Sequence, residues 1–356
     1  MKRLTCVFLA LAVMLMVPGF AFADKVDSLI KQEMQKHQIA GLALNISKDG
    51  HPIKTKGYGK ANLEWDVPVQ RDTVFEIGSI TKQFTAACIL LLVQDGKLSV
   101  DDKINAHLKV APTNWSNITI RHLLTHTSGL PNYTLLDGFE LRQHLTQEQF
   151  IQKLSAQPVV FQPGDSWSYC NSGFNLLGYI IENTSGERYW DFLHERILAP
   201  LQMTSTRDRS PSAIVRHRAA GYEMKNHQPI NRDYDLTDIF SAGAIVSTVA
   251  DMAKWDAALN GESLLNQSSK ESAWTPTKLN NGKVQNYGFG WYVGDYKGHR
   301  NIGHGGATSG FSASIQRFPD DHLSIIILCN ADELNVATVL AKEVADLYLE
   351  KHPNTQ

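Results

Sequence analysis

Cysteine is scarce in this chain of 356 residues. Of four cysteines, Cys6 lies in the N-terminal segment, and the other three form no Cys-x-x-Cys pair and no zinc-ligand spacing: Cys88, Cys170 and Cys329. An odd number of thiols does not fit a disulfide framework, so we expect these three to be free and buried.

An excess of charge of either sign is also missing, since the formal net charge is −2 and no basic stripe stands out. This excludes the electrostatic surface by which proteins bind nucleic acids or anionic membranes. The share of hydrophobic residues, 43%, excludes a disordered chain and can support one large domain or two interleaved ones. We therefore expect a small-molecule or peptide substrate and no nucleic-acid partner.

One apolar run stands at the N-terminus, from Val7 to Val17, and it is too short to be a typical membrane-spanning helix. Lys2 and Arg3 precede it, and Ala21-Phe22-Ala23 follows as a small-x-small cleavage site. The pattern predicts a cleavable secretory signal over the first 23 residues rather than a membrane anchor. We expect a secreted or periplasmic protein that has no membrane span after cleavage.

Strand patterns gather at the two ends of the chain, and helical periodicity dominates the middle. The first predicted elements are a helix through Val26 to Met34, a hairpin that turns at Asp49-Gly50, and a helix from Ser79 to Gln94. Near the C-terminus the patterns predict strands at Tyr287 to Val293, Arg300 to Gly303, Phe311 to Phe318 and Leu323 to Cys329, and a last helix at Leu334 to Leu349.

These elements predict an α+β fold of the broader α/β class. Its antiparallel sheet is flanked by the terminal helices, and a mostly helical domain is inserted into it. Residues 24–78 and 266–356 would form the sheet domain and residues 79–265 the helical domain. The active site is expected in the cleft between the two.

The first candidate for chemistry is Ser79-Ile80-Thr81-Lys82 at the start of a helix, where residues three apart share a face. The Lys82 amine can accept a proton from the Ser79 hydroxyl only if its pKa is lowered, for example by burial. The apolar context of Ile77 to Leu92 fits that requirement. Alone the pattern is weak: Ser79 could simply cap the helix.

Chance is expected to give on the order of one or two Ser-x-x-Lys matches in a chain of this length, and Ser28 to Lys31 is another. That copy lies on a predicted amphipathic surface helix near the cleavage site. Ser79, in contrast, follows a strand-like segment and opens a buried helix. Position therefore favours Ser79.

The second candidate is Tyr169-Cys170-Asn171, which follows a turn-rich stretch and precedes a helix. The phenol could relay or accept the serine proton, and the amide could hold the lysine and a substrate carbonyl. The alternative is a capping asparagine beside a packed tyrosine.

The third candidate is the run from His304 to Phe311, in which Gly305 and Gly306 let a strand edge approach a ligand closely. Backbone N–H groups would then become available there. The alternative is a plain hairpin turn with a single histidine.

In this order and with these separations, the three segments resemble the Ser-x-x-Lys, Tyr-x-Asn and Lys-Thr-Gly motifs of class C β-lactamases and related penicillin-recognising hydrolases. The segment from His122 to Leu130 resembles a structural signature of that family, so the likeness covers nearly the whole mature chain. The family fold is the one predicted above.

The resemblance implies that Ser79 is the nucleophile, that Lys82 and Tyr169 handle protons, and that Asn171 contacts Lys82 and a substrate amide. The oxyanion hole would consist of the N–H groups of Ser79 and Ala307, with Gly306 beside the latter. Lys82 and Tyr169 stay alternative bases, because they can titrate as a coupled unit. We expect no cofactor and no metal.

His304 departs from the β-lactamase pattern, since it stands in place of the lysine, and Gly305 stands in place of the threonine. A histidine with an ordinary pKa of about 6.5 is mostly neutral at pH 7 and holds a substrate carboxylate less well than lysine. The expected function is an exported D-alanyl-D-alanine carboxypeptidase or a related D-peptidase or amidase. An esterase or β-lactamase of the same fold, and a non-catalytic penicillin-binding sensor, remain alternatives. Tyr133, Trp167 and Tyr222 are expected near the cleft.

Two other enzyme classes fit less well. His122 and His126 lie four apart, as zinc ligands on a helix would, but the catalytic glutamate of His-Glu-x-x-His is missing and Thr127-Ser128-Gly129 indicates that the helix ends. No serine lies in the Gly-x-Ser-x-Gly elbow that an α/β-hydrolase needs.

Overall fold

The computed structural model describes residues 18–140, 142–232 and 237–350. Residues 1–17, which hold most of the predicted signal, lie outside the described residues. Within the described ranges, every helix is too short or too polar to cross a membrane.

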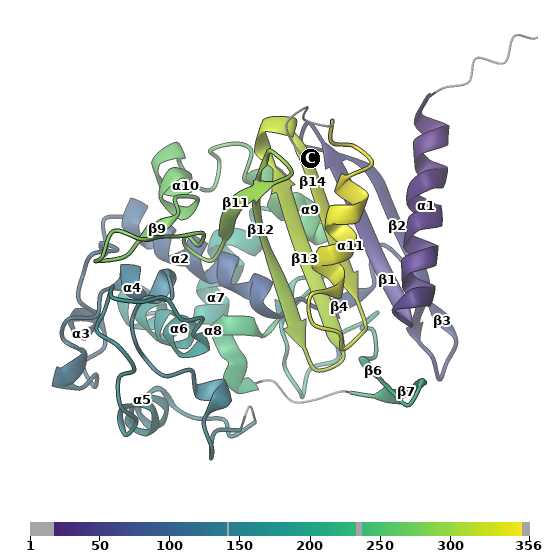
Figure 1. The fold of residues 1–356 in the computed structure, drawn as a ribbon. Coiled ribbons are helices and arrows are strands. Elements are labelled where there is room, and N and C mark those ends of the chain that lie inside the picture. Colours follow the sequence, from purple (N-terminus) through teal and green to yellow (C-terminus); the bar gives the residue numbers. More distant parts are fainter. Residues whose placement is uncertain (1–17, 141, 233–236, 351–356) are drawn as a thin grey trace, which may run out of the picture.

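A seven-stranded antiparallel sheet organises the molecule (Figure 1), in the order β11-β12-β13-β14-β1-β2-β3. The pairing of β1 with β14 joins the two ends of the chain, with Leu42 opposite Cys329 and Lys48 opposite Leu323. The strands are β1 Gly41–Lys48, β2 His51–Asn62, β3 Val67–Pro68, β11 Tyr292–Tyr296, β12 His299–Thr308, β13 Phe311–Phe318 and β14 Leu323–Cys329.

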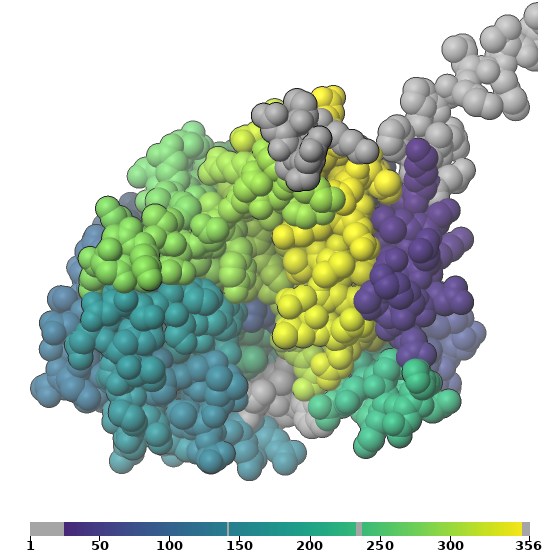
Figure 2. All heavy atoms as spheres, viewed as in Figure 1, coloured from purple at the N-terminus to yellow at the C-terminus, as the bar shows by residue number. Residues whose placement is uncertain are grey.

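The terminal helices α1 (Pro18–Lys36) and α11 (Val336–Ala345) cover one face of the sheet side by side (Figures 1 and 2). Alternate residues of β1, such as Leu42 and Leu44, pack with these helices, whereas Ala43 belongs to the core on the other face. This alternation follows from the period of two along a strand.

The other face of the sheet carries α9, and the helical region extends from there. The remaining helices are α2 Thr81–Gln94, α3 Ile104–His107, α4 Ile120–Leu124, α5 Gln147–Ser155, α6 Asn171–Ser185, α7 Tyr189–Leu193, α8 Phe240–Gly243, α9 Val249–Ala258 and α10 Gln267–Ala273. The smaller sheets are β4 Val74–Glu76 with β8 Ile245–Thr248 and β5 Arg207–Asp208, β6 Tyr222–Lys225 with β7 Gln228–Asn231, and β9 Thr277–Lys278 with β10 Val284–Gln285.

The predicted α+β architecture is confirmed, and the division at residues 79 and 265 stays a prediction. Two strand predictions were wrong in extent. β11 begins at Tyr292 instead of Tyr287, because Gly290 adopts φ +76° and interrupts the extended run. β12 continues through the glycines after Gly303 to Thr308, so residues 304–308 are strand and the hairpin turn is confined to Ser309 and Gly310.

Candidate active site

Ser79 lies in the 3₁₀ helix η1 (Gly78–Ile80), directly before α2. The first turn of α2 carries Lys82, whose Nζ is 3.0 Å from Ser79 Oγ. The spacing of three residues thus places hydroxyl and amine in hydrogen-bond contact, as the sequence predicts. Ser28, the chance copy of the pattern, is exposed on α1.

Lys82 is fully buried, and its amine reaches two further oxygens. Nζ donates to Asn171 Oδ1 at 2.8 Å and to the backbone carbonyl of Ala242 in α8 at 2.7 Å. Burial lowers the pKa of Lys82 well below its ordinary value. A neutral amine has two donors and one lone pair, so it can serve both oxygens and still accept the proton of Ser79.

Tyr169 lies in the loop before α6, and its side chain interacts with that of Ser79, with which it lines the same cleft. Burial of the phenol raises the pKa of Tyr169, so the side chain stays protonated at neutral pH. The Lys82 Nζ also lies 4.8 Å from the centroid of this ring. The phenol and the amine therefore flank the same hydroxyl.

Asn171 is the first residue of α6, and two polar side chains hold it, one at its backbone N–H and one at its side-chain amide. Its backbone N–H donates to Asn132 Oδ1 at 3.1 Å, and its Nδ2 donates to Thr134 Oγ1 at 3.2 Å. The amide oxygen is thereby left to accept from Lys82. Sequence reasoning missed Asn132 and Thr134, because only the fold brings their loop to α6.

Strand β12 passes very close to Ser79, and two glycines make this possible. A Cβ on Gly78, which has φ +50°, would lie 2.7 Å from Ala307 N, and one on Gly306 would lie 1.9 Å from the carbonyl oxygen of Ile77. Side chains at either position would push the strand away. The backbones of Ser79 and Ala307 thus lie side by side, as an oxyanion hole requires.

A buried ion pair fixes the far end of this strand. Glu76 in β4 accepts from Arg209 Nε at 2.8 Å, and its other carboxylate oxygen accepts from Thr308 Oγ1 at 2.7 Å. Thr308 directly follows Ala307. Sequence reasoning missed this network, although a glutamate between buried neighbours in Thr73 to Ile77 is a signal that a partner is needed.

His304 lies in β12 and is almost fully buried, with 3% of its surface exposed. Its Nδ1 is 2.5 Å from the carbonyl oxygen of Gly305, and its Nε2 is 3.0 Å from the hydroxyl of Tyr287. A carbonyl can only accept, so Nδ1 carries the proton and Nε2 accepts from the tyrosine. Burial lowers the pKa of His304 to about 3. His304 is therefore neutral at neutral pH.

Ser79, Tyr169 and His304 open onto a cleft of about 360 Å³ between the helical region and α11, where the surface in Figure 2 is hollowed. The lining residues are Ser79, Tyr169, Tyr292, His304, Gly305, Gly306, Ala307, Ala313, Leu334, Asn335 and Thr338. None of these described lining residues is a lysine or an arginine.

None of the three aromatic residues expected near the cleft lines it, and the tyrosines of its lining are Tyr169 and Tyr292. Tyr133 is buried, and its hydroxyl donates to the carbonyl of Asp238. Tyr222 donates to Glu64. Trp167 packs edge-on against His126 and at a tilt against Tyr287 without lining the cleft.

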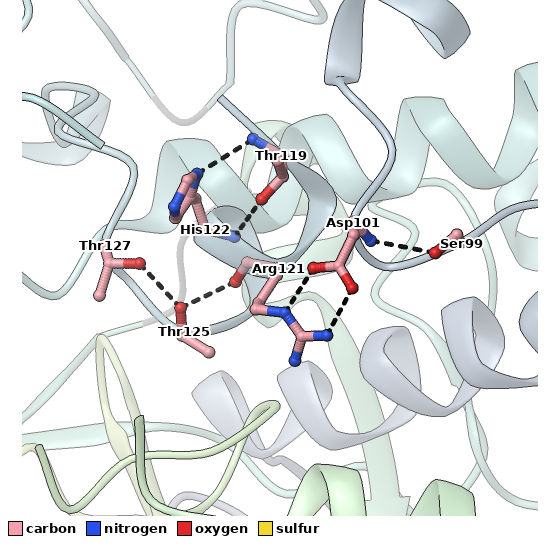
Figure 3. A network of polar contacts seen from close by, with 7 residues as sticks. All are labelled: Ser99, Asp101, Thr119, Arg121, His122, Thr125 and Thr127. Atoms are coloured by element: carbon pink, nitrogen blue, oxygen red, sulfur yellow. Dashed lines mark hydrogen bonds and ion pairs between the residues drawn. The ribbon is translucent and has the colours of Figure 1, made fainter. Parts of the chain in front are cut away.

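The segment from His122 to Leu130 has a structural role, as Figure 3 shows for its first half. Thr119 and His122 cap α4 reciprocally: the Thr119 N–H donates to His122 Nδ1, and the His122 N–H donates to Thr119 Oγ1. Thr125 Oγ1 donates to the carbonyl of Arg121, whose guanidinium forms a bidentate pair with Asp101. His122 therefore serves as a helix cap.

The three cysteines of the described chain are free and buried, as predicted. Cys170 turns its thiol toward the carbonyl of Leu130, at 3.4 Å, whereas its neighbours Tyr169 and Asn171 interact with Ser79 and Lys82. Burial raises the pKa of this thiol, which makes it unreactive.

Several known proteins resemble the chain over most of its length. Penicillin-binding protein 4* of Bacillus subtilis (strain 168) is 32% identical over 318 residues, which cover 84% of this chain and 70% of that protein. Protein flp of Staphylococcus aureus (strain MW2) is 29% identical over 318 residues, which cover 86% of this chain and 63% of that protein. The chain thus spans about two thirds of the length of these relatives.

Among solved structures, the octameric penicillin-binding protein homologue from Pyrococcus abyssi matches with a TM-score of 0.80 and 27% identity, over 94% of this chain and 78% of that one. The family model described as Beta-lactamase matches residues 26–350. The match includes every residue of the cleft described above. The chain therefore belongs to the β-lactamase family of serine hydrolases.

Proposed function

We propose that the enzyme cleaves amide or ester bonds of D-amino-acyl substrates through an acyl-enzyme on Ser79. The proton of Ser79 Oγ passes to the neutral amine of Lys82 as Oγ attacks the substrate carbonyl. The N–H groups of Ser79 and Ala307 stabilise the oxyanion. The carbon–nitrogen or carbon–oxygen bond then breaks, the leaving group takes a proton from the Lys82–Tyr169 pair, and water releases the acid.

The observation that carries this proposal is the position of Lys82. Its amine is fully buried and lies within 3.0 Å of Ser79 Oγ, Asn171 Oδ1 and the Ala242 carbonyl. A permanently charged lysine so enclosed would need a carboxylate partner, whereas the three neighbours are all uncharged oxygens. A neutral Lys82 beside a protonated Tyr169 supports lysine as the base.

For the substrate, we propose an uncharged group on the leaving side. His304 is neutral, and the described residues that line the cleft contribute no lysine or arginine. Nothing there matches the negative charge of a free C-terminal carboxylate. This favours an amidase, or a peptidase that accepts blocked peptides, over a D-alanyl-D-alanine carboxypeptidase. The D-amino-acyl side is part of the same proposal and rests on the resemblance of the three motifs to those of penicillin-recognising hydrolases.

The first test is the intact mass of the protein after incubation with a fluorophosphonate and, separately, with a penicillin. The fluorophosphonate should add one label to wild type and to Ser28→Ala and none to Ser79→Ala, and any penicillin label should depend on Ser79 in the same way. Ser28 is a matched control because it is the other serine of a Ser-x-x-Lys pattern. Labelling that survives in Ser79→Ala would contradict the proposed nucleophile.

The second test compares a peptide that ends in D-alanyl-D-alanine with the same peptide carrying a C-terminal amide. We expect kcat/KM to be higher for the amide by about tenfold or more, which corresponds to about 1.4 kcal/mol. A preference for the free acid would support a carboxypeptidase. An acyl-enzyme that persists without turnover would support the penicillin-binding sensor.

Export stays a proposal that depends on residues 1–23. Expression of the full chain in a bacterial host, followed by fractionation and mass measurement, tests it. We expect a product in the periplasm or medium that begins at Asp24, and an uncleaved chain inside the cell would contradict export.

A further inference from the structure

We infer that His126 is a positioning residue for Tyr169, because it holds the backbone on both sides of that tyrosine and packs against its ring. The inference rests on the proposed function, in which Tyr169 handles protons. It assigns a role to the second half of the segment His122 to Leu130, which the proposed mechanism leaves without one.

The hydrogen bonds of His126 bracket Tyr169 in the sequence. The N–H of Ser168 donates to the carbonyl oxygen of His126 at 3.0 Å, and the N–H of Cys170 donates to His126 Nδ1 at 3.1 Å. One residue thus fixes the peptide before Tyr169 through its backbone and the peptide after it through its side chain.

The imidazole also contacts the tyrosine ring directly. The two ring centroids are 4.3 Å apart with a tilt of 42°. Phe174 and Tyr287 approach the same imidazole at 5.2 and 4.6 Å, so His126 sits within an aromatic cluster. A rigid support of this kind restricts where the Tyr169 hydroxyl can lie relative to Ser79.

His126 acts as a fixed support rather than a proton carrier. Its Nδ1 accepts the Cys170 N–H, so the single proton of the neutral ring is on Nε2. Burial lowers its pKa well below the ordinary value. The tautomer therefore stays the same around neutral pH.

The backbone of His126 adopts φ +59°, a left-handed conformation that is uncommon outside glycine and asparagine. The following residues continue to hold the loop that leads to Tyr169: Thr127 accepts from the N–H of Gly164 at 2.9 Å, and Gly129 from the N–H of Val160 at 2.8 Å. The unusual turn is thus anchored by several bonds to one loop.

Two substitutions separate the contributions of His126. His126→Asn keeps an acceptor near the place of Nδ1 and suits φ +59°, but it loses the ring. His126→Phe keeps a ring but leaves the Cys170 N–H without its acceptor. We expect His126→Phe to lower the acylation rate by about 10- to 100-fold with KM little changed, and His126→Asn to recover part of that loss.

The deciding measurement is a double-mutant cycle with Tyr169→Phe. If His126 acts through the tyrosine hydroxyl, His126→Phe should cost about tenfold or more in wild type and almost nothing further in Tyr169→Phe. Losses that multiply would overturn the inference, as would an unchanged acylation rate in His126→Phe.

A control for general destabilisation is His299→Asn. His299 is also a buried, hydrogen-bonded histidine, but its partners are Asp321 and the carbonyl of Glu350, outside the cleft. It should lower the thermal midpoint without lowering the acylation rate of the folded fraction. If it lowers that rate as much as His126→Phe does, the effect is structural and the inference is wrong. Labelling at Ser79 by a fluorophosphonate tests the proposed function separately.

Discussion

The hydroxyl of Thr308 donates to the carboxylate of Glu76 at 2.7 Å, and this contact joins the end of β12 to the strand that leads into Ser79. Arg209 holds the other carboxylate oxygen at 2.8 Å. The contact thus spans the gap between the segments that carry the Ser79 and Ala307 N–H groups. It therefore helps to set the separation of these two N–H groups.

Removal of the Thr308 hydroxyl should therefore weaken the oxyanion hole. We expect Thr308→Val to lower kcat by about tenfold and the free energy of unfolding by about 1.5 to 3 kcal/mol, as for a hydrogen bond to a charged group. Thr308→Ser keeps the hydroxyl and is the matched control. Steady-state kinetics and urea unfolding measure both quantities, and equal kcat values for Val and Ser would contradict the prediction.

The close approach of β12 predicts a steric effect at Gly306. A methyl group there would lie 1.9 Å from the Ile77 carbonyl oxygen and 3.2 Å from Ser79 N. We expect Gly306→Ala to displace the strand and lower kcat by about a hundredfold or more, the effect of losing one oxyanion donor. Gly261→Ala is the control, because a Cβ there meets nothing within 4 Å. If both variants keep wild-type kcat, β12 does not carry the oxyanion donor.

The pH dependence of acylation should identify the base. Lys82 accepts a proton only when uncharged, so kcat/KM should fall as the pH falls through its lowered pKa. Tyr169→Phe should keep this acid limb at a lower rate, and Lys82→Arg should lose acylation. A rate that rises only above pH 10, the ordinary pKa of tyrosine, would point to the phenolate of Tyr169 instead.

His304 should make stability depend on pH. Its pKa is 6.5 ordinarily and about 3 in the folded protein. Between these values the unfolded chain binds a proton that the folded protein does not, so stability is highest above pH 6.5 and falls as the pH drops toward 3, by about 1.4 kcal/mol per unit. Between pH 4 and 6 the free energy of unfolding, measured with urea, should therefore rise with pH. In His304→Gln this slope should be smaller by the contribution of one proton, about 1.4 kcal/mol per pH unit. Equal slopes in wild type and variant would contradict the prediction.

The parts of the site that could be predicted from the sequence are local. Ser79 and Lys82 share one helical turn, and Tyr169 and Asn171 share one loop, so their spacing along the chain reflects their spacing in space. The glycines before Ala307 also indicated a close backbone approach. The fold followed from strand patterns at both chain ends, where Phe311–Phe318 and Leu323–Cys329 were predicted at their observed bounds.

The parts that could not be predicted depend on contacts between distant segments. The Ala242 carbonyl that binds Lys82 is a backbone atom and leaves no trace in residue type. Asn132 and Thr134 resemble ordinary loop residues until the fold brings them to Asn171. The buried state of His304 depends on Tyr287, which packs over it from a segment that was predicted to be strand.

The pairing of β1 with β14 also constrains the order in which the protein can fold. Residues 41–48 leave the ribosome long before their partner strand, residues 323–329, is made. The central sheet therefore cannot close until residues 323–329 have been synthesised, and until then β1 waits with one edge unpaired.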